Sequence, residues 1–205
     1  MGNKLLFVVG GLVVIIVLLY VGVQIVLDPI VVVDKNNNQN IMSNSFSLSS
    51  SAFVDGEMIP AQYTCDGDNT PPPLIISGVP IGTKSLVLVM DDSDIPKEIK
   101  EAQGIEKFDH WALYNIPPET TEISNLENFN AGENGIGEMR YTGPCPPANY
   151  EPTEHHYSFR LYALSGILNF IKTPTLDELE LAATGMVIEK TELVGRYQRV
   201  VVPNK

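Results

Sequence analysis

The chain has 205 residues and a mass of 22.5 kDa, which allows one ordinary domain and an appendage. Thirteen basic and 25 acidic residues give a net charge of −12 and a pI near 4.6. Such a chain has no basic field of the kind that holds nucleic acid or an anionic lipid surface, so nucleic acid is excluded as a partner.

A long apolar segment lies near the N-terminus. Of the 23 residues from 5 to 27, 19 are apolar and none is charged. A helix of this length extends about 34 Å, which is enough to cross a hydrocarbon core of about 30 Å. Lys4 precedes the segment and Asp28 follows it, so we expect a short inner tail (1–4), a single-pass anchor (5–27) and an extracytoplasmic domain. The alternative is a secreted protein released from a cleaved signal, although the apolar run is longer than a usual signal core.

A polar, asparagine-rich stretch follows the apolar segment. It offers few side chains that a core could bury, so we assign residues 28–45 to a flexible linker. The folded domain is then expected over residues 46–205.

Four segments of this domain are predicted strands. The apolar run at 85–90 is typical of a strand buried on both faces, and residues 157–164 alternate between apolar and polar. Prolines and glycines are spread between the segments and supply turns. The pattern predicts a mostly β domain, a β-sandwich rather than β-α-β units. The predicted strands are 74–76, 85–90, 111–116 and 157–164.

Helical signals appear only near the C-terminus. Thr175 can cap a helix, and Glu178 stands three residues later, which is the spacing of a capping box. Gly185 can end that helix. A second short helix is expected over residues 186–194.

The chain contains two cysteines, Cys65 and Cys145. In an exported protein they are expected to form a disulfide, which would close a loop of about 80 residues and join two turn-rich segments. A zinc site and a catalytic thiol are the alternatives. Zinc sites usually have paired Cys-x-x-Cys spacing, which is absent, and a catalytic thiol would leave the second cysteine without a role.

The candidates for chemistry are three histidines and a run of aspartates. His110 and the pair His155–His156 begin predicted strands, whereas Asp92 and Asp94 follow the end of another. Side chains at strand ends converge when the strands share a sheet, so we expect these groups at one rim of the sandwich. Imidazolium and backbone N–H groups there could bind a phosphate or carboxylate oxygen. The alternative is that the histidines are surface residues and the aspartates form a turn.

Four motifs occur in a fixed order along the domain. They are DDSDIP (91–96), HWALYNIP (110–117), GPCPP (143–147) and HHYSFRLYAL (155–164). This set resembles the phosphatidylethanolamine-binding protein family, in particular its prokaryotic Raf kinase inhibitor-like branch, and the resemblance extends from residue 46 to residue 199.

The resemblance implies a β-sandwich with a small anion pocket at one end. Two departures from the family pattern stand out, because Ser93 and Ile95 replace the usual Pro and Ala, and His156 replaces the usual Arg. The residues that match the family's pocket, and are therefore predicted to bind the ligand, are Asp92, Asp94, His110, Gly143, Pro144, Pro146, His155 and Tyr157.

The function expected from these patterns is a membrane-tethered, exported domain that binds a small anion or a phosphate-containing head group. A regulatory or inhibitory role follows from the resemblance, with an extracytoplasmic protein as the class of partner that fits. Catalytic residues, a cofactor and a metal are not expected. The alternative is a hydrolase, dependent on a metal or on His and Asp, in the same pocket, although the chain lacks Gly-x-Ser-x-Gly and His-Glu-x-x-His motifs.

Overall fold

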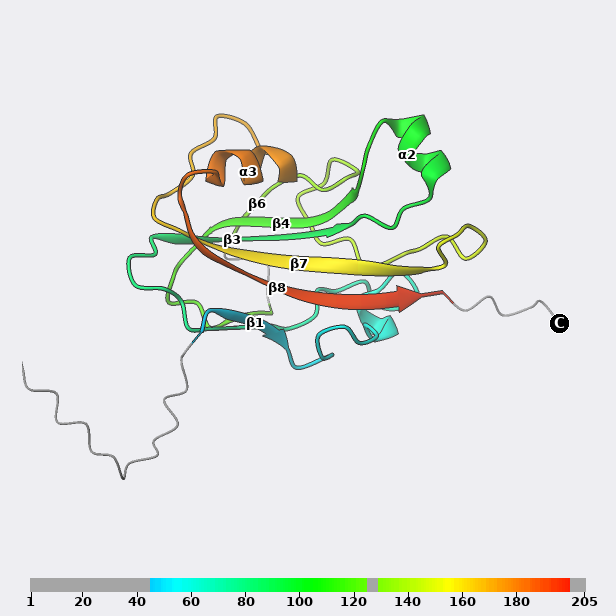
Figure 1. The fold of residues 1–205 in the computed structure, drawn as a ribbon, viewed down its shortest axis with the longest axis horizontal. Coiled ribbons are helices and arrows are strands. Elements are labelled where there is room, and N and C mark those ends of the chain that lie inside the picture. Colours follow the sequence, from blue (N-terminus) through cyan, green and yellow to red (C-terminus); the bar gives the residue numbers. More distant parts are fainter. Residues whose placement is uncertain (1–44, 125–128, 200–205) are drawn as a thin grey trace, which may run out of the picture. The chain divides into compact units, whose positions relative to one another are not determined.

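The computed structural model describes residues 45–124 and 129–199. The predicted anchor lies outside these ranges, and within them no helix is long and apolar enough to cross a membrane. Figure 1 shows the arrangement of the elements. In chain order they are β1 (Ser47–Ser50), the 3-10 helix η1 (Ala61–Tyr63), β2 (Leu74–Ser77), β3 (Ser85–Asp92), α2 (Lys97–Gln103), β4 (Phe108–Ile116), β5 (Glu122–Ile123), β6 (Asn130–Ala131), β7 (Glu154–Leu164), α3 (Leu176–Ala183) and β8 (Val187–Gln198).

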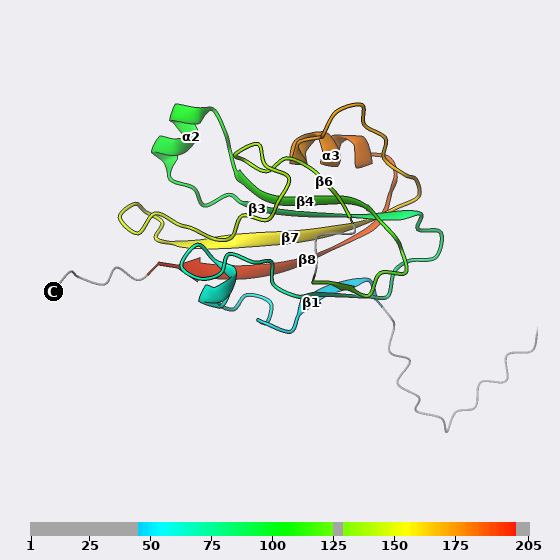
Figure 2. The same cartoon turned by 180° about the vertical axis from the view of Figure 1, so that it is seen from behind.

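The strands form two antiparallel sheets. The larger has the order β6-β4-β3-β7-β8 and the smaller the order β1-β2-β5. One hydrophobic cluster lies between the sheets, and a second lies between the large sheet and α3. Figures 1 and 2 show the small sheet on one side of the large sheet and α3 on the other. The predicted mostly β class is confirmed.

Strand β3 lies at the centre of the large sheet, between β4 and β7. All eight of its residues are buried. Leu86, Leu88 and Met90 point into the cluster between the sheets, whereas Val87 and Val89 point toward α3. A strand covered on both faces needs apolar side chains at consecutive positions, which is what the apolar run predicted.

The C-terminal region confirms one predicted helix and contradicts the other. Thr175 and Glu178 make the predicted capping box at the start of α3, and Gly185 follows this helix with a φ of 86°. The helix predicted over residues 186–194 is wrong, because β8 occupies this segment and pairs with β7 along its length. β8 is an edge strand whose first part is exposed. It can therefore carry charged residues that resemble a helical pattern, while Val and Ile favour the strand.

Candidate functional site

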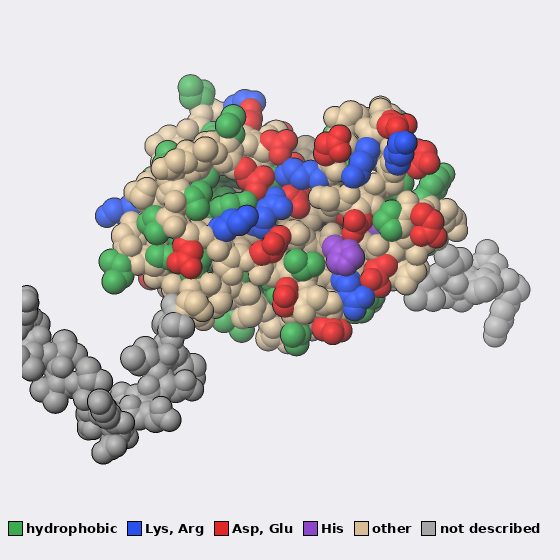
Figure 3. Space-filling model, in the orientation of Figure 1, with side chains coloured by type: hydrophobic (Ala, Val, Ile, Leu, Met, Phe, Trp, Pro, Cys, Tyr) green, Lys and Arg blue, Asp and Glu red, His purple; other side chains and the backbone are tan. Residues whose placement is uncertain are grey.

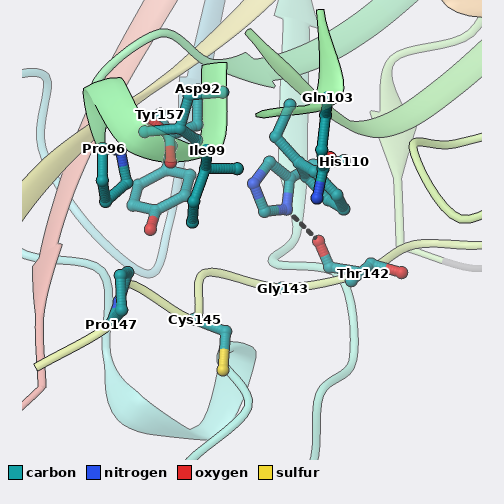
Figure 4. Close-up of a pocket in the computed structure, with 12 residues that line it drawn as sticks. Asp92, Pro96, Ile99, Gln103, His110, Thr142, Gly143, Cys145, Pro147 and Tyr157 are labelled. Atoms are coloured by element: carbon teal, nitrogen blue, oxygen red, sulfur yellow. Dashed lines mark hydrogen bonds between the residues drawn. The ribbon is translucent and has the colours of Figure 1, made fainter. Parts of the chain in front are cut away.

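A cavity of about 250 Å³ lies at the end of the sandwich where β3 ends and β4 and β7 begin. Helix α2 and the loop at residues 142–147 form its other walls (Figure 4). The cavity is lined by Asp92, Ile95, Pro96, Ile99, Gln103, Phe108, His110, Thr142, Gly143, Cys145, Pro147 and Tyr157.

Asp92 reaches the cavity because of its position in β3. Side chains alternate along a strand, so Asp92 shares the inner face with Leu88 and Met90, whereas Asp91 lies on the α3 face. Asp92 is the last residue of β3 and is 3% exposed. A buried carboxylate at this point requires partners that compensate for lost hydration.

Both oxygens of the Asp92 carboxylate have such partners. Oδ1 accepts a hydrogen bond from the Asp94 N–H at 2.7 Å, and Oδ2 lies 2.6 Å from Nδ1 of His155. The Nε2 atom of His155 lies 3.0 Å from the Pro152 carbonyl oxygen, which can only accept a hydrogen bond. Burial opposes protonation of His155, but the hydrogen bond and charge of Asp92 raise its pKa. His155 is therefore an imidazolium whose two N–H groups are both used within the protein.

His110 has the opposite arrangement. Trp111 pairs with Met90 and Asp109 with Asp91, so a bulge in β4 leaves His110 without a partner across the ladder. Such bulges redirect side chains, and here the ring turns into the cavity. Nδ1 donates to the Thr142 carbonyl at 2.6 Å, which leaves Nε2 available to a ligand (Figure 4). Burial lowers the pKa of His110, so its neutral form presents an Nε2 lone pair.

Tyr157 completes the polar part of the cavity. Its side chain is fully buried, and its hydroxyl, which lies by the Cys145 backbone N–H, donates its proton to no residue that the structure describes. The ring of Tyr157 packs edge-on against the ring of His110, with 5.2 Å between the centroids. Burial raises the pKa of Tyr157 far above its usual value, so the hydroxyl keeps its proton and can act as a donor.

The loop at residues 142–147 is fixed by contacts with residues far away in the sequence. Cys145 forms the predicted disulfide with Cys65, which is confirmed with a Cα–Cα distance of 5.4 Å. Gly143 packs so closely that a Cβ atom would lie 2.4 Å from the Tyr63 carbonyl oxygen, and its N–H donates to Asn69. These contacts hold one wall of the cavity in place, and a side chain at residue 143 would displace it.

The structure brings together half of the eight residues predicted to bind the ligand. Asp92, His110, Gly143 and Tyr157 line the cavity. The other four lie beside or behind it and do not line it: Asp94, Pro144, Pro146 and His155.

Asp94 is directed away from the cavity. Its Oδ2 accepts hydrogen bonds from the backbone N–H and the ring of His156, at 2.9 and 2.8 Å. This contact explains how His156, which stands where the family usually has Arg, pairs with the second aspartate of the motif.

Several lining residues were not predicted as ligand-binding. Phe108 stands two residues before His110, and Thr142 stands just before the predicted loop. Ile95, Ile99 and Gln103 recur every fourth residue, a spacing that places side chains on one face of a helix. The expectation that helical signals occur only near the C-terminus is therefore wrong, because this spacing marks the inner face of α2, which was not predicted. Within the described part of the chain, no group of three or more His, Cys, Asp or Glu side chains is placed to hold a metal ion.

Comparison with known proteins gives matches over most of the chain. The family model described as "Phosphatidylethanolamine-binding protein" matches residues 49–198. A UPF0098 protein of Pyrococcus abyssi is 39% identical over 159 residues, which cover 73% of this chain and 84% of that protein. A UPF0098 protein of Chlamydia trachomatis is 37% identical over 154 residues, which cover 74% and 98% of the two chains.

Two solved structures have a similar fold. One is a homologue of the phosphatidylethanolamine-binding proteins from Chlamydia trachomatis, with a TM-score of 0.70 and 36% identity; the match covers 77% of this chain and 100% of that one. The other is YbcL of E. coli, with a TM-score of 0.65 and 25% identity, covering 76% and 99% of the two chains. The region matched by the family model, residues 49–198, contains every residue that lines the cavity.

Proposed function

The chain belongs to the phosphatidylethanolamine-binding protein family, and from this premise we propose that its cavity binds an anionic oxygen of a small ligand, such as phosphate, a carboxylate or a phosphate-containing head group. One observation carries the proposal. The buried Tyr157 hydroxyl donates its proton to no described residue and lies in the same cavity as the Nε2 atom of His110. Leaving a buried donor unpaired costs about 1–3 kcal/mol, and a ligand oxygen would offset this cost.

The two groups would act together on the ligand. The Tyr157 hydroxyl donates one hydrogen bond to the anionic oxygen. Because Nδ1 of His110 is already bonded to the Thr142 carbonyl, Nε2 can donate only after it gains a proton. Binding of an unprotonated anion is therefore coupled to uptake of one proton by His110, and affinity should rise as the pH falls.

The proposal assigns recognition rather than turnover to the cavity. The single carboxylate that lines it, Asp92, is already paired with His155 and hydrogen-bonded by Asp94. Asp92 is therefore a poor general base, and the paired carboxylate also offers little to a cationic amine. The other basic atom that faces the cavity, Nε2 of His110, is assigned to binding the anion after it gains a proton. A regulatory or inhibitory role, exerted by the ligand-bound domain on an extracytoplasmic partner, is consistent with this assignment.

A matched pair of variants tests ligand binding. The full-length chain, purified in a mild non-ionic detergent, is titrated with phosphate and with acetate by calorimetry. Tyr157→Phe should weaken binding at least tenfold, because a hydrogen bond to a charged group contributes about 1.5–3 kcal/mol. Tyr141→Phe is the control, since Tyr141 is also buried but its hydroxyl donates to the Tyr63 carbonyl at 2.7 Å. Equal loss in both variants, or no binding by the parent chain, would contradict the proposal.

We further propose that residues 5–27 tether the domain to a membrane. Support comes from the apolar sequence of these residues, in which 19 of 23 side chains are apolar and none is charged. Carbonate extraction of membranes and sequencing of the mature N-terminus test the tether. A chain that stays in the membrane fraction with its first residues intact is expected, whereas a soluble chain beginning within residues 28–45 would indicate a cleaved signal.

A further inference from the structure

The cavity has a second part whose chemistry differs from that of the polar end. Ile95, Pro96 and Ile99 line it from the segment after β3 and the start of α2, and Phe108 lines it from the start of β4. Figure 4 shows Pro96 and Ile99 on the α2 side of the cavity, next to the Tyr157 ring. Ile95, Ile99 and Phe108 are only half-buried, so part of their apolar surface remains for an occupant to cover.

The charges around the cavity limit what it can hold. No Lys or Arg is among its lining residues, and the nearest imidazolium, His155, is committed to Asp92 and Pro152. A doubly charged group would meet only one cation there, the protonated His110, and would keep a second charge poorly hydrated and uncompensated. A single negative charge is matched by the protonated His110, and the anionic oxygen can accept hydrogen bonds from His110 and from the Tyr157 hydroxyl.

The size of the cavity limits the apolar part of the ligand. At about 250 Å³ it is slightly smaller than the usual range for ligand pockets. A long hydrocarbon chain does not fit inside this volume together with an anionic head, whereas a few methylene groups do.

From these three features we propose that the cavity selects singly charged anions that carry a short alkyl group, with the anionic oxygen at His110 and Tyr157 and the alkyl group against Ile95, Ile99 and Phe108. This inference rests on the proposed function and adds the class of ligand. Short alkanoates and phosphodiesters share this chemistry, and separate titrations distinguish them.

The test is a chain-length series measured by calorimetry on the full-length protein in detergent. Acetate, propionate and butyrate form the carboxylate arm, and dimethyl and diethyl phosphate form the phosphodiester arm. Each methylene group that leaves water for the apolar wall should raise affinity about fourfold, so butyrate should bind about 15-fold more tightly than acetate. The arm with the higher affinity at equal alkyl length identifies the head group.

A variant tests whether the dependence of affinity on alkyl length arises from the apolar wall at Ile99. In Ile99→Asn, butyrate should bind less than threefold more tightly than acetate. Acetate should still bind, because His110 and Tyr157 are unchanged. Ile171→Asn is the control, since Ile171 is fully exposed, lies outside the cavity and should leave the series unchanged.

The possible results separate the two proposals. Equal affinity across the series in the parent chain would overturn the alkyl preference and leave anion binding standing. Absence of binding by every anion would overturn both. If Ile99→Asn does not fold, the series on the parent chain still decides, because affinity that does not rise with chain length overturns the inference.

Discussion

Two neighbouring aspartates, Asp91 and Asp92, end strand β3 on opposite faces of the large sheet, and their surroundings differ. Asp91 faces α3 and lies in a closed network: Lys107 lies 3.1 Å from its Oδ2, and Arg160 binds both of its oxygens. Glu180 of α3 extends this network to Arg160 and to the Tyr162 hydroxyl. On this face, every carboxylate named here has a cationic partner.

On the opposite face of β3, some polar side chains are fully paired and others are not. Asp92 is fully paired, through His155 and the Asp94 N–H, yet beside it the Tyr157 hydroxyl donates to no described residue and His110 uses only its Nδ1 atom. The same sheet edge therefore contains a structural charge network and a candidate binding site. Burial of charge therefore does not mark the site by itself, whereas polar atoms that face a cavity without a partner do.

Figure 3 shows that neighbouring opposite charges also occur on the surface. Acidic and basic side chains lie next to one another across the face seen in this view. Most of these pairs are exposed and contribute little to stability, so the buried pairs on β3 give the largest expected effects.

The largest effect is expected from breaking the closed pair behind the cavity. His155→Ala leaves the Asp92 carboxylate buried without its imidazolium, which should lower the free energy of unfolding by about 3–5 kcal/mol in urea denaturation. His156→Ala is the control, because its ring is mostly exposed and pairs only with Asp94, and it should lose at most about 1 kcal/mol. Similar losses in the two variants would mean that His155 is not structural.

A smaller effect is expected on the α3 face. Arg160→Leu removes one of the two cations that contact Asp91 and should lower the free energy of unfolding by about 2 kcal/mol. The loss is smaller than for His155→Ala because Lys107 still pairs with Asp91. Phosphate affinity should stay within twofold of the parent value, since Arg160 faces away from the cavity. A tenfold loss of affinity in a folded Arg160→Leu variant would show that the two faces are not independent.

The smallest expected effect is on how stability changes with pH, because His155 and His110 should contribute in opposite directions. The raised pKa of His155 means that its contribution to stability is complete below about pH 6.5 and is lost as the pH rises through its folded-state pKa. The lowered pKa of His110 means that its contribution is present above about pH 6.5 and is lost as the pH falls through its folded-state pKa. Each slope is at most about 1.4 kcal/mol per pH unit.

Unfolding midpoints measured from pH 5 to pH 9 check this pair. His155→Gln should flatten the decline of stability above pH 6.5, and His110→Gln should flatten the decline below it. If both variants change the slope of stability on the same side of about pH 6.5, the assignment is contradicted, because it requires one histidine with a free ring nitrogen (His110) and one with both nitrogens hydrogen-bonded (His155).

Much of the fold could be predicted from periodicity and local signals. The apolar run of β3 predicted burial on both faces, and Thr175 with Glu178 predicted the start of α3, because these features depend on residues close in sequence. β8 could not be recognised in the same way. Its charged first half is accommodated because it lies at a sheet edge, and that position is set by pairing with β7.

The site was predictable in its location but not in its hydrogen bonding. The motifs placed Asp92, His110 and Tyr157 at one end of the sandwich. Which histidine stays open depends on two backbone carbonyls, those of Thr142 and Pro152, in loops whose course the sequence pattern does not reveal. The apolar wall was not predicted because α2 has only seven residues, most of them polar. The spacing of four residues between Ile95, Ile99 and Gln103 was nevertheless visible in the sequence.

Nitrogen NMR of the histidine rings during a phosphate titration tests the distinction between the open and the closed histidine most directly. The Nε2 resonance of His110 should move with phosphate concentration and saturate, while both ring nitrogens of His155 stay at imidazolium positions throughout. Movement of the His155 resonances while His110 stays unchanged would contradict the account.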